Sequence, residues 1–201
     1  MLKKSLVVAS LLLIGSSLVA QDSGLYLGVS YGKTTVDTGI TNLTGTASLD
    51  ESDMGTKIFA GYKVNKNISA EFQYIDFGDV TLKGNNGDKF KSSGVTYVFN
   101  QNNVSISSNV KSFGLSGIYS VDLTDNIKPY VKVGVHKWDE TYTLETSSLS
   151  SNIQGGDDTD LFYGLGLNME ITSNVSARLE YEKYKATSDL NYLSVGIAYS
   201  F

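Results

Sequence analysis

The feature that most constrains this chain is an alternation of apolar and polar residues that recurs along most of its 201 residues. The last twelve residues, LNYLSVGIAYSF, show it most clearly, because Leu193, Val195 and Ile197 share one face and Ser194 and Gly196 the other. A period of two over such a length predicts a β-strand. Segments of this kind lie at 25–33, 56–64, 68–78, 111–121, 127–138, 161–171, 175–184 and 190–201. The sequence therefore predicts an all-β fold with eight antiparallel strands.

The first twenty residues have the three-part pattern of a secretory signal peptide. Lys3 and Lys4 supply the basic start, residues 6–14 are apolar apart from one serine, and small residues precede Ala20. The apolar part is too short to span a bilayer as a helix. We expect residues 1–20 to be a cleaved leader and residues 21–201 to form a single β-barrel domain. No later stretch reaches the roughly 18 apolar residues of a membrane helix.

The composition excludes several classes of function. The formal net charge is −5, which argues against nucleic acid as a partner. The chain has no cysteine, so it has no disulfide, thiolate metal site or cysteine nucleophile. Thirteen tyrosines, twenty glycines and a single proline suit many strands with few breaks.

Alternation alone does not say which face of the strands is inside. A soluble, lipocalin-like barrel would enclose the apolar set. Here the polar set is rich in glycine and serine, which suit a crowded interior better than a solvent-facing strand. The apolar set carries a tyrosine near many strand ends, as in the aromatic girdles of a lipid-facing band, namely Tyr31, Tyr74, Tyr119, Tyr163, Tyr181 and Tyr199. These patterns predict a barrel with its apolar side chains in lipid.

The connections between the predicted strands alternate in length. Those at 65–67, 122–126 and 172–174 are tight turns, whereas those at 36–55, 79–110 and 139–160 are long and polar. Residues 185–189 form the one short connection on the long-loop side. This asymmetry is typical of an up-and-down outer-membrane barrel, with long loops outside the cell. Because backbone groups in lipid must all be paired, the last strand must pair with the first.

An internal repeat predicts charges inside the barrel. Residues 61–74, GYKVNKNISAEFQY, align without gaps to residues 168–181, NMEITSNVSARLEY. The alignment places Glu71 and Arg178 at equivalent interior positions of two opposite strands. The lumen of an eight-stranded barrel is narrow enough for side chains to fill it, so the two can meet. We predict an interior charge network of Glu71, Lys132, Arg178 and Glu180, with Lys57, Lys63 and Glu182 nearby.

Four stretches then carry a family resemblance: FAGYKVNKNISAEFQYIDFG at 59–78, IKPYVKVGV at 127–135, SARLEYEKY at 176–184 and the terminal LSVGIAYSF. In this order they resemble the small eight-stranded outer-membrane barrels of the OmpA and OmpX type. The resemblance implies the outer membrane of a Gram-negative bacterium as location, with membrane lipid and lipopolysaccharide as surroundings.

Two further implications of the resemblance concern particular residues. The family's interior acid–base pairing maps onto Glu71 and Arg178, although one acidic interior position of the sixth strand is Asn168 here. In the family, the last aromatic residue is part of the pattern read by the barrel-assembly machinery. By resemblance, Gly196, Tyr199 and Phe201 are the assembly signal of this chain, and that machinery is an expected partner.

The sequence offers little for enzymatic chemistry. A lipid A deacylase of this fold would show a His-x-Ser pair, whereas the only histidine, His136, is followed by Lys137 and Trp138. No nucleophile, base and orienting group stand out together. Three aspartates at 157, 158 and 160 are interpreted as a solvated loop rather than a Ca²⁺ site. We therefore predict no catalytic, cofactor-binding or metal-binding residue.

The function that fits best is a non-enzymatic integral outer-membrane barrel. Its long loops would act in surface contact or envelope integrity, with a host or surface ligand as a possible partner. The alternative is a narrow, porin-like channel for ions or small solutes, lined by the interior charges. A lipid A-modifying enzyme is the third and least favoured interpretation.

Overall fold

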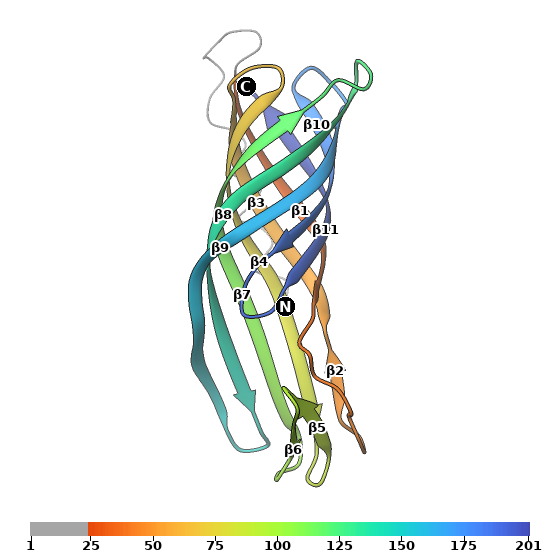
Figure 1. Cartoon of the computed structure of the whole chain (residues 1–201), viewed down its shortest axis with the longest axis vertical. Helices are drawn as coiled ribbons and strands as arrows, with labels where there is room; N and C mark the ends of the chain where they lie inside the picture. The colour runs from red at the N-terminus through yellow and green to blue at the C-terminus, as the bar shows by residue number, and fades with distance from the viewer. Residues whose placement is uncertain (1–23) are drawn as a thin grey trace.

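The computed structural model describes residues 24–201, which consist of strands and their connections (Figure 1). The expected leader, residues 1–20, lies outside the described residues. Eight long strands form the barrel: β1 (Leu25–Val36), β3 (Ser52–Lys63), β4 (Ile68–Gly84), β7 (Val104–Ser120), β8 (Ile127–Glu145), β9 (Ser150–Glu170), β10 (Val175–Tyr184) and β11 (Leu190–Ser200). Three short strands lie in the connections: β2 (Ser48–Asp50), β5 (Lys89–Ser92) and β6 (Val95–Val98). No helix among the described residues has the length and apolar character needed to cross a membrane.

The eight strands form a closed antiparallel barrel, as predicted. Each strand pairs with its neighbour along the chain, and β1 also pairs with β11, in a register that runs from Tyr26 opposite Ser200 to Val36 opposite Leu190. Beyond the strand, the Phe201 amide donates to the Leu25 carbonyl at 3.0 Å. The predicted pairing of the last strand with the first is therefore confirmed.

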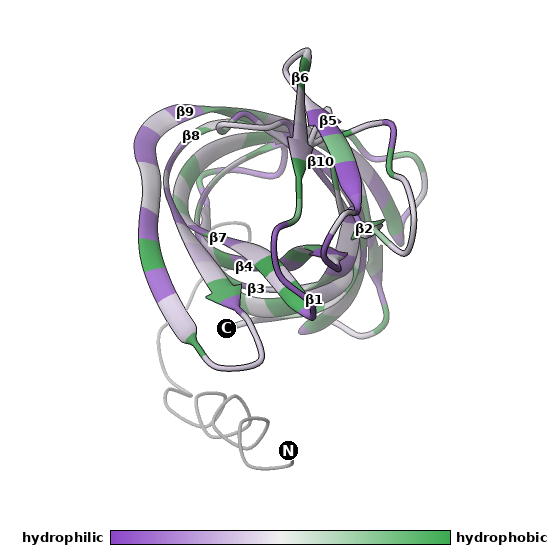
Figure 2. Ribbon diagram, turned by 90° about the horizontal axis from the view of Figure 1, so that it is seen from below, coloured by the Kyte–Doolittle hydropathy of each residue, from purple (hydrophilic) through white to green (hydrophobic). Residues whose placement is uncertain are grey.

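The apolar side chains of the strands face outward. The prediction of a barrel with its apolar side chains in lipid and its polar side chains inside is therefore also correct. Leu165 of β9 and Val195 of β11 are each 63% exposed, whereas the polar residues that alternate with the apolar ones along the strands face the lumen. Figure 2 shows the same alternation as bands of opposite hydropathy along the strands. A barrel with this exterior needs a hydrocarbon environment, because such a large apolar surface is unfavourable in water.

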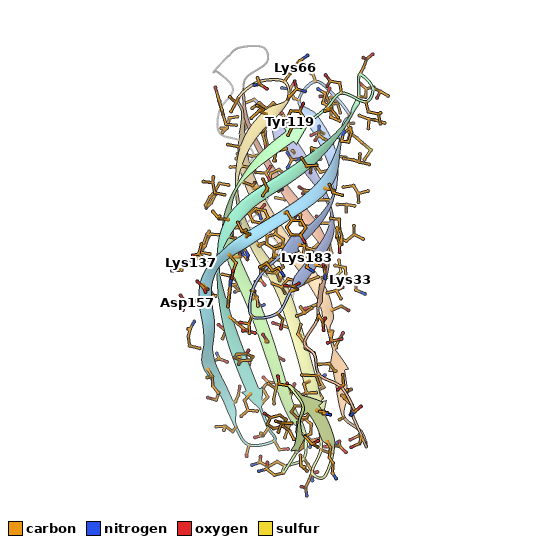
Figure 3. All side chains as sticks on the ribbon, viewed as in Figure 1. Lys33, Lys66, Tyr119, Lys137, Asp157 and Lys183 are labelled. Atoms are coloured by element: carbon orange, nitrogen blue, oxygen red, sulfur yellow. The ribbon has the colours of Figure 1, made fainter. Side chains whose placement is uncertain are left out.

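Each outward row of apolar residues ends at a polar or charged residue toward the long-loop end. On β1 the row passes from Tyr31 to Lys33, and on β10 it passes from Tyr181 to Lys183. Figure 3 shows Lys33, Lys137, Asp157 and Lys183 at one level of the long axis, with Lys66 and Tyr119 near the short-turn end. We call Lys33, Lys137 and Lys183 the lysine collar. It marks the boundary of the lipid-facing band.

Beyond the collar, the strands continue further than the sequence indicated. The segment 139–160 was expected to be a loop, but β8 and β9 extend through it as a hairpin whose connection is only residues 146–149. The segment 79–110 likewise contains the long-loop ends of β4 and β7 and the β5–β6 hairpin. These segments are polar in composition, yet their alternating threonine, tyrosine and leucine residues pair well as strands.

The long-loop end has a small apolar core of its own, which we call the extracellular core. Leu82, Phe99 and Val104 are buried there, and further side chains from β2, β5 and the β1–β2 connection pack against them. Asp88 fixes the connection between β4 and β5, since its carboxylate accepts hydrogen bonds from the Thr46 hydroxyl at 2.6 Å and the Asn85 amide at 2.9 Å. The connections at the long-loop end thus form a folded layer beyond the lipid-facing band.

Candidate functional site

Charged side chains fill the middle of the barrel. Lys132 of β8 lies at the centre of this network, where its ammonium donates to Glu71 and Glu180 at 2.8 Å and to Glu182 at 3.0 Å. All four side chains are almost fully buried. A buried ammonium is tolerated only when carboxylates replace its hydration shell, and here three of them do so.

The Arg178 guanidinium closes one end of the network, on the side of the short turns. Its Nη1 donates to Glu71 Oε2 at 2.7 Å, and the Tyr26 hydroxyl donates to the same oxygen at 2.9 Å. The guanidinium plane lies against aromatic rings, with Cζ 4.5 Å from the Phe59 centroid and 5.5 Å from that of Tyr130. Arginine suits this position because it stacks and donates at once.

The structure brings together all four residues predicted for the network, Glu71, Lys132, Arg178 and Glu180. It also makes two residues central that the sequence had placed only nearby. Lys57 donates to Glu180 at 2.8 Å and forms a second ion pair with Glu182. Three basic and three acidic side chains are therefore paired within the charge network.

Other interior residues belong to different levels or were not predicted. Lys63, expected near the network, lies closer to the short turns and donates to Ser200 Oγ at 3.2 Å. Reasoning from charge alone missed the lumen-facing aromatic residues Tyr26, Phe59 and Tyr130. The strand alternation contained that information, because Phe59 shares a row with Lys57 and Tyr130 shares one with Lys132.

A layer of aromatic residues covers the network on the long-loop side. The Tyr184 and Phe162 rings stack with centroids 4.8 Å apart, and the Phe77 ring meets Tyr184 edge-on at 4.9 Å. Gln73 reaches this layer from the side of the charge network and donates to the Tyr184 hydroxyl at 2.6 Å. Tyr184 and Phe162 are fully buried, so this layer separates the charges from the extracellular side.

His136 lies at the edge of the aromatic layer, next to a serine that the sequence had not linked to it. Its Nε2 lies 2.8 Å from the Lys185 carbonyl oxygen, which can only accept, so Nε2 carries a proton. When the ring is neutral, Nδ1 then accepts from the Ser112 hydroxyl at 2.8 Å. Ser112 and His136 are both 1% exposed, so a substrate has no access to them. The pair ties β7 and β8 to the β10–β11 connection.

The three aspartates of the β8–β9 extension do not converge. Asp160 accepts from the Trp138 indole at 2.9 Å, whereas Asp157 and Asp158 are exposed. Among residues 24–201, no group of three or more histidine or acidic side chains is placed to hold a metal ion.

The residues assigned to the assembly signal lie at the closing seam of the barrel. Gly196 of β11 faces the lumen opposite Ser30, where an added methyl group would overlap the serine side chain. Tyr199 and Phe201 face outward with ring centroids 5.1 Å apart. The recognition of these residues by the assembly machinery stays a prediction.

On the extracellular side of the aromatic layer lies a cavity of about 410 Å³, which we call the extracellular cavity. Phe77, Val110 and Leu190 form part of its wall, and Ser92 and Ser93 of the β5–β6 hairpin border it. The interior thus has three levels along the axis: the charge network, the aromatic layer and this cavity.

These features define a class of protein. A closed eight-stranded barrel with an apolar exterior, a polar core and alternating short and long connections is an integral outer-membrane β-barrel. The chain belongs to the OmpA-like transmembrane domain family, whose model matches residues 20–201. The predicted resemblance and the outer-membrane location are confirmed.

Two relatives are similar to this chain along its whole length. Outer membrane protein A of Salmonella typhi is 26% identical over 223 residues, which cover 100% of this chain and 56% of that protein. An uncharacterized protein of Haemophilus influenzae is 27% identical over 207 residues and is covered completely, as is this chain. The chain thus spans just over half the length of the outer membrane protein A that it matches.

Two solved structures share the fold. One is the crystal structure of Ail, the attachment invasion locus protein of Yersinia pestis, in complex with the heparin analogue sucrose octasulfate, with a TM-score of 0.57 at 14% identity. The other is Neisserial surface protein A, NspA, with a TM-score of 0.57 at 17% identity. Each match covers 90% of this chain and 100% of the other.

Proposed function

We propose that this protein is a non-enzymatic surface protein, whose barrel anchors a folded extracellular layer that contacts ligands or other surfaces. The observation that carries the proposal is the closure of the lumen. The paired charges and the buried Phe162–Tyr184 stack lie one above the other across the barrel. A solute crossing the barrel would have to displace both levels, so the interior supports anchoring rather than transport.

The extracellular layer supports the same proposal from the opposite side. It has its own apolar core around Phe99 and a long β8–β9 hairpin beyond the lysine collar. Val95, Tyr97, Leu149 and Ile153 are about half exposed there, outside the lipid-facing band. Rigid loops with exposed apolar and aromatic side chains are suited to recognition.

The charge of this layer bears on the kind of surface ligand. Taken together, the segments 34–56, 79–111, 137–161 and 183–191 contain 13 acidic residues and 7 lysines, although lysines are more numerous within 79–111 and 183–191. A highly sulfated ligand, such as the one crystallised with Ail, is therefore disfavoured for this chain. We propose a neutral or cationic ligand instead.

The lysine collar supports lipopolysaccharide as the surrounding lipid. Lys33, Lys137 and Lys183 face outward at the level where lipid phosphates lie in an outer leaflet. Lys183 also contacts Asp189 at 2.8 Å, which holds its ammonium at that level. The barrel-assembly machinery is the partner we propose for insertion.

Two measurements on the barrel test this proposal. The chain refolded in planar bilayers should show no conductance steps once heat-dependent gel mobility proves that it has folded. In cells, replacing residues 141–154 by a tight turn should abolish surface adhesion, whereas changes in the turn at 172–174 should not. Steady conductance, or unchanged adhesion without the hairpin, would contradict the proposal.

A narrow channel is the second candidate function, and one observation favours it. Glu71 is bonded to both Lys132 and Arg178, so its ion pairs can exchange without leaving a charge unpaired. Conductance steps that change when Glu71→Gln is introduced would support this candidate. A lipid A-modifying enzyme is disfavoured, because His136 is sealed beneath side chains.

A further inference from the structure

The extracellular cavity lies between two apolar clusters of the interior, and neither the barrel nor its anchoring role requires it. Its volume of about 410 Å³ lies within the usual range for small-molecule sites, about 300–1,000 Å³. Strands from β1 to β11 and the β10–β11 connection line it, and Ser92 and Ser93 of the β5–β6 hairpin border it. Folded elements can therefore surround a molecule of moderate size there.

The wall toward the membrane belongs to the apolar cluster around the aromatic layer, which we call the barrel cluster. Its buried members include Trp138 and the Phe162–Tyr184 stack. Six residues that belong to this cluster or pack against it also line the cavity, namely Val36, Phe77, Val80, Val110, Ala186 and Leu190. The packing of the cluster holds these side chains in place, so this wall is already formed without a ligand.

The opposite wall belongs to the extracellular core. Leu82 is buried in that core and lines the cavity, and Ile40, Leu49 and Ile106 pack against the same core and line the cavity as well. Every aliphatic residue of the lining, and its one phenylalanine, is thus part of one cluster or the other. An apolar molecule in the gap would contact both clusters and would remove apolar surface of each from water.

The polar side chains of the lining do not require a charged ligand. Glu140 is buried, and its carboxylate already accepts a hydrogen bond from the Ser108 hydroxyl at 2.5 Å. Asp53 and Asp79 are exposed, so water solvates their carboxylates. The polar groups of the wall therefore have partners in the protein or in solvent.

The distribution of charge favours a neutral ligand. Among residues 24–201, no lysine, arginine or histidine lines the cavity, so the carboxylate of a fatty acid would meet acidic side chains and no base. A cation would lose hydration on entry, and the exposed Asp53 and Asp79 would compensate little because water screens them. A neutral molecule avoids both costs.

We propose that the extracellular cavity binds a small, neutral and mainly apolar molecule, such as a compact alicyclic alcohol or hydrocarbon, from the extracellular side. Its body packs between Phe77 and Leu190 of one wall and Leu82 and Ile106 of the other. Apolar cavities bind such molecules because water gains few hydrogen bonds inside them. The aromatic layer closes the site toward the charge network, so the molecule is held and does not cross the membrane.

Three compounds with the same hydrocarbon cage test the class of ligand: adamantanol, adamantylammonium and adamantanecarboxylate. We would titrate the refolded barrel in phosphatidylcholine bicelles and record the fluorescence of Trp138, the only tryptophan of the chain, which packs in the barrel cluster. The alcohol should cause a saturable change, with an affinity at least about tenfold above that of either charged compound. No saturable change, or a charged compound that binds as tightly as the alcohol, would overturn the proposal.

Cavity-filling variants separate binding in the cavity from partition into lipid. Val80→Phe and Ala186→Phe each add a ring at a partly buried position of the wall, and each should weaken the binding of adamantanol at least about tenfold because the ring occupies the site. Val95→Phe, at a side chain that is 53% exposed, is the matched control and should bind like the wild-type chain. Gel mobility checks the fold of every variant, and the second filled position serves if the first does not fold. Unchanged binding in a folded filled variant would refute the site.

Hydrogen exchange tests the contact with both walls. Adamantanol should slow the exchange of amides near Leu49, Leu82 and Ile106, because the extracellular core gains a packing partner. Unchanged exchange at saturation would place the molecule on the barrel cluster alone and would overturn the site between the clusters.

This inference does not depend on the proposed surface role, because adhesion is measured in cells and the binding of adamantanol on the refolded barrel. Loss of adhesion without loss of adamantanol binding, or the reverse, distinguishes the two.

Discussion

Lys132 illustrates, at the scale of one residue, why charges can fill this lumen. Removing an ammonium group from water costs several kcal/mol even after relaxation, and a single carboxylate seldom compensates for that cost. Lys132 has three carboxylate partners within 3.0 Å, and each of these carboxylates is shared with another base. Sharing means that removing one member leaves several others incompletely paired. The energies of these residues should therefore be strongly coupled.

The Glu71–Arg178 pair is the clearest test of that coupling. In a double-mutant cycle with Glu71→Gln and Arg178→Met, we expect an interaction free energy of about 1–3 kcal/mol, because the two side chains meet at 2.7 Å in a buried site. Equilibrium unfolding of the refolded barrel in urea provides the four free energies. Lys128 and Glu170, which meet at 2.8 Å on the partly exposed rim, form the control pair. Their coupling should stay below about 1 kcal/mol, and similar values for both pairs would count against a special role for burial.

Asp88 leads to a prediction about pH in the extracellular layer. The hydrogen bond from the Thr46 hydroxyl and those from the Asn85 and Thr46 amides lower the pKa of Asp88 below its ordinary value. A carboxyl group whose pKa is lower in the folded state stabilises that state above its unfolded pKa, and this stabilisation disappears as the pH falls through the folded value. Below about pH 4, the amides of Asn85 and Thr46 should therefore begin to lose protection, measured as their exchange rate relative to that of an unstructured amide at the same pH. In Asp88→Asn they should exchange fast already at neutral pH, and a wild-type rate in that variant would refute the role.

At the scale of the strands, the sequence predicts some features well and others poorly. The alternation of Leu193, Val195 and Ile197 predicts the strand, its outward face and its pairing with β1, because lipid requires closure. The ends of β8 and β9 were missed, because only Tyr142 and Leu144 alternate with threonine in 139–160, and the many Asp, Ser, Asn and Gly residues around them hide so short a period. The Glu71–Arg178 contact followed from the internal repeat. Ser112 and His136 were not linked, because their contact depends on the register of β7 and β8.

Gly196 tests how tightly β11 fits against β1. In Gly196→Ala the new methyl group would lie 2.7 Å from the Val29 carbonyl oxygen and would overlap Ser30 Oγ, so the backbone must shift. We expect a loss of about 1–3 kcal/mol in the free energy of unfolding, as for other overpacked interiors. Gly117→Ala is the matched control, since nothing lies within 4 Å of its added methyl group. If the two variants were equally stable, β1 and β11 would be able to shift apart at Gly196 at little cost in free energy.

Phe201 separates folding from assembly. Its ring faces outward against Tyr199, and its amide continues the pairing with β1, which a substitution of the side chain retains. Phe201→Ala should therefore refold in detergent at nearly the rate of the wild-type chain but accumulate poorly in the outer membrane of cells. Slow refolding in detergent would instead assign the residue a structural role.

Among residues 24–201, the packing within the lipid-facing band and the extracellular core form two regions that follow one another along the barrel axis. The charge network and the aromatic layer hold the barrel within the lipid-facing band, whereas the cluster around Leu82, Phe99 and Val104 holds the loops beyond it. The extracellular cavity lies between them, so few side chains connect the two regions directly. Regions joined in this way can unfold locally without global loss of structure.

Phe99→Ala tests that independence. Phe99 is 6% exposed and packs against Phe90 with ring centroids 5.3 Å apart, so truncation should cost the extracellular core about 3–5 kcal/mol. We expect amides in 40–49 and 85–104 to lose protection from hydrogen exchange, while the temperature of the gel-mobility transition stays that of the wild-type barrel. Val98→Ala, at a side chain that is 56% exposed, should change neither measurement. If Phe99→Ala also lowered the barrel transition, the two regions would form one cooperative unit, and shortening the loops would have to be assessed as a change to the whole fold.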